Sequence, residues 1–392
     1  MGIDEGKSFS VKVVDNVVVH AHEPCNNHWL PFTNLDLLVA PFDVGSFFCY
    51  KKPSHGSFST IINTLKASLS RALSLYYPLA GEILWNVDAR ENQIHCNNRG
   101  VDFTEAVADV QLKQLNLYNP DESIEGKLIP KKLHGVLAIQ VTELKCGGMV
   151  IGCMFDHRAA DGYSANMFIS SWADITRSGS PSMLPSFNRS FFNPRFPTTY
   201  SSSIDDVFAI FEPPTKPDHD QNHENDDLLI NRVYYIEGKQ LGRVQSLAIE
   251  NERRRSKELK GMSLSQIATE VHEFLQIATT KEHFVDLIDW VEERRSQPLV
   301  ARAFASRDMS VMISSGQRFQ IMDKMDFGWG KVAFGSCHVP SSRKDCYVMT
   351  LPSPTKNEDW VVYMHMPMKI MNYIEKHANH MFKPMNTEYL QI

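Results

Sequence analysis

The sequence predicts a soluble α/β protein, with enough chain for two domains of ordinary size or for one large unit. Its length of 392 residues sets that bound on domain count. Stretches rich in β-branched residues alternate along the chain with stretches of helical periodicity, as expected for a mixture of strands and helices. The composition, 43% hydrophobic and 10% aromatic, is that of a soluble globular protein.

Composition also excludes several classes of protein. A net charge of −6 argues against a nucleic-acid-binding protein, which would carry a basic face. The 7 cysteines are odd in number and form no C-x-x-C pair, which favours reduced thiols in the cytoplasm over a disulfide framework or a zinc site. The first residues lack the pattern of a signal peptide, Gly6 argues against myristoylation, and no apolar run is long enough to span a membrane.

The N-terminal half contains the clearest element patterns. Residues 10–14 and 17–19 predict two opening strands, and residues 57–77 predict an amphipathic helix. That helix ends at the segment Tyr77-Pro78-Leu79-Ala80-Gly81, where proline and glycine turn the chain. Residues 136–156 predict a β-hairpin with its turn at 145–148, and a helix pattern begins at Tyr163.

Residues 202–228 are polar, acidic and proline-containing, which is the composition of a linker. The elements that we expect after it are a strand at 232–236, helices at 239–255, 263–279 and 281–294, strands at 310–313, 346–349 and 359–364, and a last helix at 368–380.

An H-x-x-x-D-G motif, formed by His157, Asp161 and Gly162, lies between the predicted hairpin and the next helix. A histidine at such a junction can face a cleft and act as a general base, although a buried or capping histidine explains the same pattern. The aspartate can cap the helix or pair with a distant arginine. A second copy, His223 and Asp227, lies in the polar linker and is expected to be solvated loop.

Two other functions fit these segments less well. A metal site at His157 and Asp161 lacks a nearby third ligand, so no metal is assigned. The segment Asp326-Phe327-Gly328-Trp329-Gly330 contains D-F-G but the chain has no glycine-rich phosphate loop and no H-R-D sequence, which excludes a kinase. Gly328 and Gly330 around Trp329 instead predict a tight turn, either structural or presenting the indole N–H as a donor.

The two motifs in this order resemble the signatures of the plant BAHD acyl-CoA-dependent acyltransferases, and residues 77–81 match a third family segment. Residues 96–106, 119–128 and 279–292 most resemble coniferyl alcohol acyltransferase-like members. The resemblance implies two chloramphenicol acetyltransferase-like domains, each a mixed sheet flanked by helices, with a channel between them. They would comprise residues 1–201 and 229–392, joined by a crossover loop at 202–228.

The resemblance also implies the chemistry. His157 would be the general base for direct transfer of an acyl group, with acetyl as the leading candidate, from acyl-CoA to a phenylpropanoid alcohol such as coniferyl alcohol. Trp329 would donate to the oxyanion. Asp161, Gly162, Asp326, Gly328 and Gly330 would support the site structurally. We expect a cytoplasmic monomer whose partners are acyl-CoA, as co-substrate, and a small alcohol. No permanently bound cofactor, nucleic acid or membrane is expected.

The chain departs from the family at one place. After the helix that ends near Lys257, relatives continue with a core helix, an arginine-bearing strand and a Y-F-G-N-type turn, whereas residues 258–265 lead directly to a later helix. Asp161 would then lack its arginine, at a cost of about 3 kcal/mol if the carboxylate is partly buried, and apolar surface would be uncovered. A splice form, a gene-model error and a divergent paralogue all fit. A non-catalytic relative that at most binds metabolites or a partner is therefore the second hypothesis.

Overall fold

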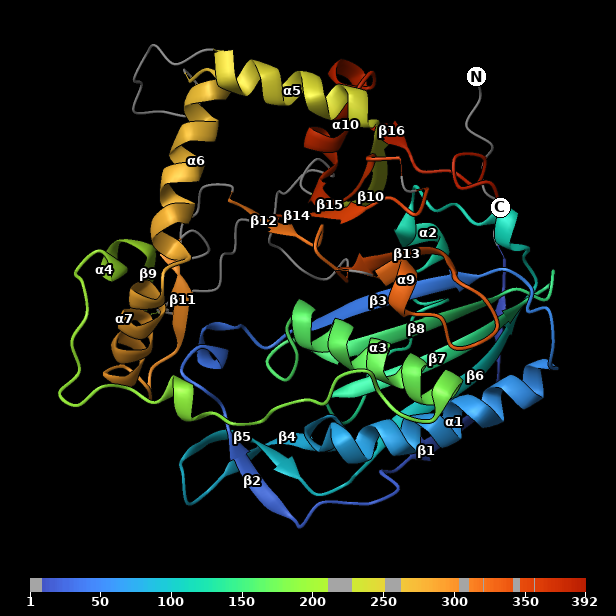
Figure 1. Cartoon of the computed structure of the whole chain (residues 1–392), viewed down its shortest axis with the longest axis horizontal. Coiled ribbons are helices and arrows are strands. Elements are labelled where there is room, and N and C mark those ends of the chain that lie inside the picture. Colours follow the sequence, from blue (N-terminus) through green and yellow to red (C-terminus); the bar gives the residue numbers. More distant parts are fainter. Residues whose placement is uncertain are drawn as a thin grey trace, which may run out of the picture.

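A computed structural model describes residues 9–210, 228–250, 262–302, 310–319, 321–340, 346–355 and 357–392 (Figure 1). His223, Asp227 and residues 258–261 of the segment at which the chain departs from the family lie outside these ranges. The described chain contains a six-stranded and a five-stranded sheet, with helices packed against both. This is the mixed α/β architecture that the sequence predicted.

The six-stranded sheet has the order β1-β6-β7-β8-β3-β13. All neighbouring pairs are antiparallel except β6 and β7. The predicted hairpin is confirmed as β7 and β8, whereas the two predicted opening strands are one strand, β1, with a register shift between Val13 and Asp15. The strand bounds are β1 Val11–Val19, β3 Asp43–Tyr50, β6 Val101–Ala108, β7 Leu137–Leu144, β8 Met149–Asp156 and β13 Val332–His338.

Helices α1 (Phe58–Leu75) and α3 (Gly162–Ser178) pack together against this sheet (Figure 1). The Ser57 side chain caps α1 by accepting a hydrogen bond from the Thr60 backbone N–H at 3.2 Å. The apolar stripe predicted for this helix is buried, and the helix ends before the 3₁₀ turn η2 (Tyr77–Ala80). Both helix predictions in this region are confirmed.

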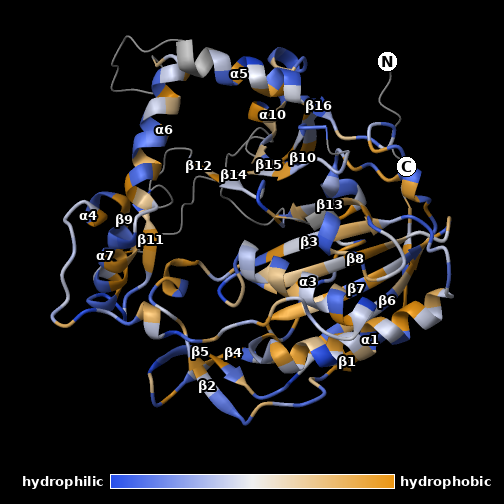
Figure 2. Ribbon diagram, in the orientation of Figure 1, coloured by the Kyte–Doolittle hydropathy of each residue, from blue (hydrophilic) through white to orange (hydrophobic). Residues whose placement is uncertain are grey.

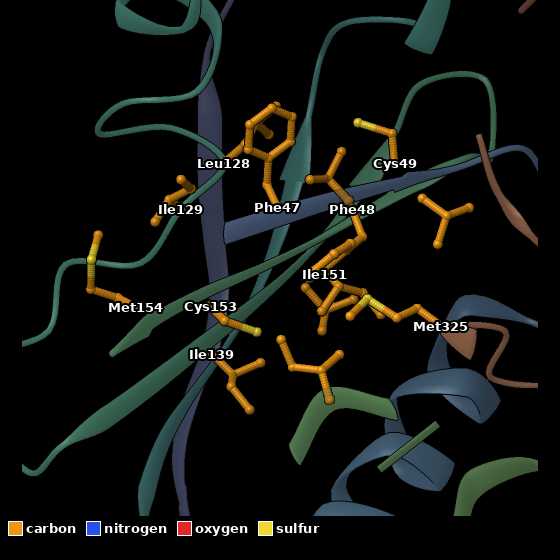
Figure 3. Close-up of a cluster of buried hydrophobic side chains, with 14 of the residues drawn as sticks. Phe47, Phe48, Cys49, Leu128, Ile129, Ile139, Ile151, Cys153, Met154 and Met325 are labelled. Atoms are coloured by element: carbon orange, nitrogen blue, oxygen red, sulfur yellow. The ribbon is translucent and has the colours of Figure 1, made fainter. Parts of the chain in front are cut away.

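The main core lies between these helices and the strands. All eight residues of β8 are buried, as expected for a strand covered on both faces. Figure 2 shows hydrophobic residues concentrated on the strands of this sheet and along α1. In Figure 3 the side chains of Phe47, Phe48, Ile139, Ile151 and Cys153 gather around β3 and β8.

The five-stranded sheet has the order β12-β14-β15-β10-β16, with β12 and β14 parallel. Its bounds are β10 Leu229–Ile236, β12 Val311–Ser315, β14 Cys346–Pro352, β15 Trp360–Pro367 and β16 Lys383–Pro384, and α5 (Gly238–Glu250) and α10 (Met368–His377) lie beside it. The strands and the last helix predicted after the linker are thus confirmed, with β16 additional.

Smaller elements complete the described chain. The predicted helices at 263–279 and 281–294 are confirmed as α6 and α7. Part of the predicted linker forms α4 and β9, and β9 pairs with β11. The bounds are β2 His28–Pro31, β4 Glu82–Asn86, β5 Glu91–Cys96, β9 Phe208–Ile210, β11 Leu299–Ala301, α2 Pro120–Ser123, α4 Ile204–Val207, α6 Leu264–Ala278, α7 Lys281–Glu292, α9 Ile321–Lys324, η1 Asp36–Leu38, η3 Leu112–Gln114 and η4 Ser190–Phe192.

Strand β13 comes from the C-terminal part of the chain but completes the N-terminal sheet. It pairs with β3 in antiparallel register, with Gly45 opposite His338 and Ser46 opposite Cys337. The domain limits 1–201, 202–228 and 229–392 stay predictions, and this pairing joins the parts on either side of the linker. Of the described helices, none is long and apolar enough to cross a membrane.

Phe327 is the side chain that anchors the segment before β13. It is 1% exposed and packs edge-on against Trp172, with 4.9 Å between ring centroids. We expect Phe327→Ala to lower the free energy of unfolding by about 3–5 kcal/mol, because it leaves a cavity in the core. Denaturant unfolding measures this loss. Phe191→Ala removes a ring that is 81% exposed and should change stability by about 0.5 kcal/mol or less. Equal losses in the two variants would contradict the packing role.

Candidate active site

His157 directly follows β8 and continues its pairing with β3. Its backbone N–H donates to the Phe42 carbonyl at 2.9 Å. Its half-buried ring packs edge-on against the Phe42 ring, with 4.9 Å between centroids. No described residue hydrogen-bonds to the buried Nδ1. The imidazole therefore caps no described element, and its position is fixed by the strand and by Phe42.

The imidazole lines a cavity of about 430 Å³, which we call the His157 cavity. Most of its lining is apolar, and the exceptions include Ser46 and Ser336. The buried Oγ atoms of these two serines have no hydrogen-bond partner among the described residues. The cavity is lined by Val44, Gly45, Ser46, Phe48, Phe155, His157, Ala160, Asp161, Gly162, Tyr163, Ala165, Asn166, Ile169, Ser314, Ser315, Phe319, Ser336, Cys337, Tyr347, Met349 and Leu351. Residues of both main sheets thus meet around His157.

A second cavity, of about 640 Å³, lies on the other side of the same strands. We call it the His338 cavity. Its walls combine apolar side chains with acidic and basic groups, and it is lined by Pro41, Phe42, Asp43, Glu125, Gly126, Ile129, Pro130, Lys131, Lys132, Met154, Asp156, His338 and Pro340.

Strand geometry explains why the two cavities are separate. Side chains of successive strand residues point to opposite faces of a sheet. On β8 and just beyond it, Phe155 and His157 line the first cavity, whereas Met154 and Asp156 line the second. On β13, Cys337 lines the first cavity and His338 lines the second. The cavities therefore lie on opposite faces of β3, β8 and β13, and the contact of Phe42 with His157 joins their linings at the strand ends.

Asp161 caps helix α3. Its carboxylate accepts a hydrogen bond from the Ser164 backbone N–H at 2.7 Å, which satisfies one of the free donors at the helix start. The side chain is exposed, and no described lysine or arginine forms an ion pair with it. The cost expected for a partly buried, unpaired carboxylate therefore does not arise, because water reaches this group. Gly162 follows as the first residue of the helix, in the lining of the His157 cavity.

The Asp326–Gly330 segment forms a tight turn before β13. One carboxylate oxygen of Asp326 accepts from the backbone N–H groups of Gly328 at 2.8 Å and Gly330 at 3.3 Å. Both glycines have positive φ, 107° and 135°, which side-chain-bearing residues rarely adopt. Tyr50 Oη on β3 donates to the Met325 carbonyl at 2.8 Å. These bonds fix the point at which β13 enters the sheet.

Trp329 lies away from His157. Its ring stacks on Phe327, with 5.8 Å between centroids, and it lines a third cavity together with Lys51 and Lys52. The structure thus places Asp161 and Gly162 beside His157 but does not bring Trp329 into the same cavity. The oxyanion role of its indole stays a prediction.

His338 is a buried polar residue that the sequence did not single out. It is 1% exposed, and burial lowers the pKa of its imidazole to about 4. Ser46 and Ser336 were also missed. None of the three belongs to a local motif, and only the pairing of β3 with β13 brings them to the cavities. Within the ranges that the structure describes, no group of three or more His, Cys, Asp or Glu residues is arranged to hold a metal ion.

Comparison with known families identifies the family to which the chain belongs. A family model described as "Transferase family" matches residues 9–256 and 251–381, which together are most of the chain. The chain belongs to the Transferase family. This is the family of BAHD acyltransferases, as the sequence motifs indicated.

Individual relatives agree with this assignment. A hydroxycinnamoyltransferase from Narcissus pseudonarcissus is 33% identical over 198 residues, 49% of this chain and 45% of the relative. Acetyl-CoA-benzylalcohol acetyltransferase from Clarkia breweri is 33% identical over 178 residues, 42% of this chain and 40% of the relative. The chain thus spans about half the length of the curated relatives that it matches, or somewhat less.

Solved structures share the fold. Vinorine synthase superposes with a TM-score of 0.62 at 19% identity, covering 96% of this chain and 99% of its own. F. graminearum TRI101, in complex with coenzyme A and T-2 mycotoxin, gives a TM-score of 0.66 at 11% identity, covering 90% and 98%. The predicted chloramphenicol acetyltransferase-like architecture is confirmed by these two neighbours.

Two substitutions distinguish a helix cap formed by Asp161 from an ion pair. Asp161→Ala removes the cap and should lower the free energy of unfolding by about 1 kcal/mol. Asp161→Asn should leave stability nearly unchanged, because asparagine caps a helix about as well as aspartate does. Denaturant unfolding of both variants measures the difference. If asparagine cost as much as alanine, the negative charge would be needed, and an ion pair rather than a cap would hold the loop.

Proposed function

We propose that the chain is an acyl-CoA-dependent O-acyltransferase, which moves an acyl group to the hydroxyl of a phenylpropanoid alcohol such as coniferyl alcohol. Acetyl is the leading candidate for the acyl group. The observation that carries the proposal is the position of His157, in one cavity and in ring contact with Phe42 of the other. Two substrates that enter from opposite faces of the sheet would meet at this imidazole.

His157 acts as the general base in this proposal. Its imidazole removes the proton of the acceptor hydroxyl while the oxygen attacks the thioester carbonyl carbon, which forms a tetrahedral oxyanion. The C–S bond then breaks, and the departing thiolate takes the proton back from His157, so that free CoA and an ester are released. One base and close approach of two bound substrates are sufficient, and no acyl-enzyme is needed.

The names of the relatives support the substrate classes. Acetyl-CoA-benzylalcohol acetyltransferase names an acetyl donor and an aromatic alcohol, and hydroxycinnamoyltransferase names an aromatic acyl group. The His157 cavity, with Phe48, Phe155 and Phe319 in its lining, suits an apolar substrate. We propose that the protein works as a cytoplasmic monomer, in keeping with its cysteine content and net charge.

Replacement of His157 tests the proposed base. With acetyl-CoA and coniferyl alcohol, His157→Ala should lower kcat by roughly 10²- to 10⁴-fold, the usual contribution of a positioned general base. Release of free CoA thiol measures the rate. His95→Ala provides a control, because His95 stacks on Trp29 in the β2-β5-β4 sheet and should retain the wild-type rate. Activity that survives in His157→Ala would remove this residue as the base.

The second candidate is a catalytically impaired relative that at most binds metabolites or a partner. The exposed apolar side chains of α6 favour it: Val271, Phe274 and Ile277 are 52%, 53% and 65% exposed. Figure 1 shows α6 running between α5 and α7, apart from both main sheets. The family model also matches in two pieces that meet at residues 251–256. Both observations suit a chain that lacks a core segment near this point.

Thermal unfolding with and without CoA separates the two candidates. A formed binding channel should give one cooperative transition, and CoA at about 100 times its Kd should stabilise the fold by about 2.7 kcal/mol, which raises Tm by several degrees. Differential scanning calorimetry gives both readouts. A broad transition that CoA does not move would favour the impaired relative.

A further inference from the structure

The His338 cavity contains a buried histidine whose hydrogen-bonding capacity is unused within the described chain. Neither Nδ1 nor Nε2 of His338 has a hydrogen-bond partner among the described residues, although both atoms are buried. Buried polar atoms are nearly always paired, so an exception such as this one points to a water or a ligand as the partner. His338 is also opposite Gly45 in the β3–β13 pairing. A Cβ at position 45 would lie 3.1 Å from Ile129 Cδ1 and 3.4 Å from the Cβ of His338, so glycine permits this close approach of the two strands.

Glu125 supplies the second polar group at this point. One of its carboxylate oxygens is 3.7 Å from His338 Nε2, too far for a direct hydrogen bond. An oxygen atom placed about 2.8 Å from each could accept from one group and donate to the other. Because burial keeps the pKa of His338 low, the ring is neutral near pH 7 and offers one N–H donor and one acceptor. The pair thus matches a neutral hydroxyl better than a charged group.

Two other carboxylates of this cavity have cationic partners. Lys132 forms an ion pair with Asp43 at 3.1 Å, and Arg158 holds the Asp156 carboxylate through two hydrogen bonds of 2.8 and 3.0 Å. The remaining walls are largely apolar and include Pro41, Phe42 and Pro340. Such flat apolar walls suit a planar ring. Phe42 also contacts the His157 ring. The aromatic ring of a substrate bound in this cavity would therefore extend from the substrate group that reacts at His157 toward His338.

We propose that His338 and Glu125 form a recognition site for the phenolic hydroxyl of an aromatic substrate. The ring would lie against Phe42, and its hydroxyl would accept from the imidazole N–H and donate to the Glu125 carboxylate. This inference rests on the proposed function. The hydroxylated ring can belong to the acceptor alcohol or to an aromatic acyl group, and the same contacts would serve either substrate. His338 is then a specificity-determining residue.

Matched substrate pairs test the site. One arm compares 4-coumaryl alcohol with cinnamyl alcohol, both with acetyl-CoA, and the other compares 4-coumaroyl-CoA with cinnamoyl-CoA, both with coniferyl alcohol. In one arm the wild-type kcat/KM should be roughly tenfold higher for the hydroxylated substrate, because a site built around a hydroxyl discriminates against a ligand that lacks it. The arm that shows this ratio identifies the substrate that occupies the cavity.

Substitutions of His338 and Glu125 test whether these residues cause the higher kcat/KM for the hydroxylated substrate. His338→Phe should reduce the ratio to about one, whereas His338→Gln, which keeps a donor and an acceptor, should retain most of it. Glu125→Ala changes a partly exposed residue and should also reduce the ratio, which keeps the test decisive if His338→Phe does not fold. His95→Phe is the matched control and should keep the wild-type ratio.

The outcomes separate this inference from the proposed function. Turnover of cinnamyl alcohol or cinnamoyl-CoA by the wild-type protein would support acyl transfer, whether or not a hydroxyl is preferred. A wild-type ratio near one in both arms, or a ratio that folded His338→Phe and Glu125→Ala variants both keep, would overturn the recognition site alone. If no substrate turns over, calorimetric binding of the two alcohols and of the two acyl-CoA thioesters gives the ratio in each arm as Kd values, and equal values within both pairs would overturn it.

Discussion

The pairing of β13 with β3 is the interaction on which the rest of the structure depends. It adds a strand from the C-terminal part of the chain to the edge of the N-terminal sheet. With β8 it forms the partition between the His157 and His338 cavities. The hydrogen bonds of Asp326 within its turn, and the bond from Tyr50 to Met325, fix where β13 begins. Gly328 and Gly330 thus act on the site through a strand, because their positive-φ backbone forms the turn that starts β13.

This arrangement gives the two motifs complementary tasks. The first places His157 at the end of β8 and starts α3 with the Asp161 cap. The second delivers β13, so that Cys337 and His338 face opposite cavities. In the proposed mechanism, the base and the partition must both be in place before two substrates can approach from opposite faces. Burial of Phe327 against Trp172 connects the two tasks, since Trp172 lies on α3.

Local sequence patterns predicted the elements that carry their own signals. The β7–β8 hairpin, helix α1 and the start of α3 have clear periodicity, a turn or a cap, and His157 follows from the strand-to-helix junction. Strand β3 was missed because Asp43–Tyr50 contains glycine and lacks a clean alternation. Other features depend on contacts between distant segments, which local sequence periodicity cannot predict. They are the pairing of β13 with β3, the distribution of strand residues between the two cavities and the burial of His338.

The late position of β13 in the sequence also affects synthesis. During translation the strands β1, β6, β7, β8 and β3 leave the ribosome long before Val332–His338 does. Until then β3 is the edge of the nascent sheet, with unpaired backbone groups and the apolar residues Phe47 and Phe48 beside them. An open apolar edge of this kind pairs readily with other chains. The topology therefore leaves the growing chain exposed to edge-to-edge association until β13 has been synthesised.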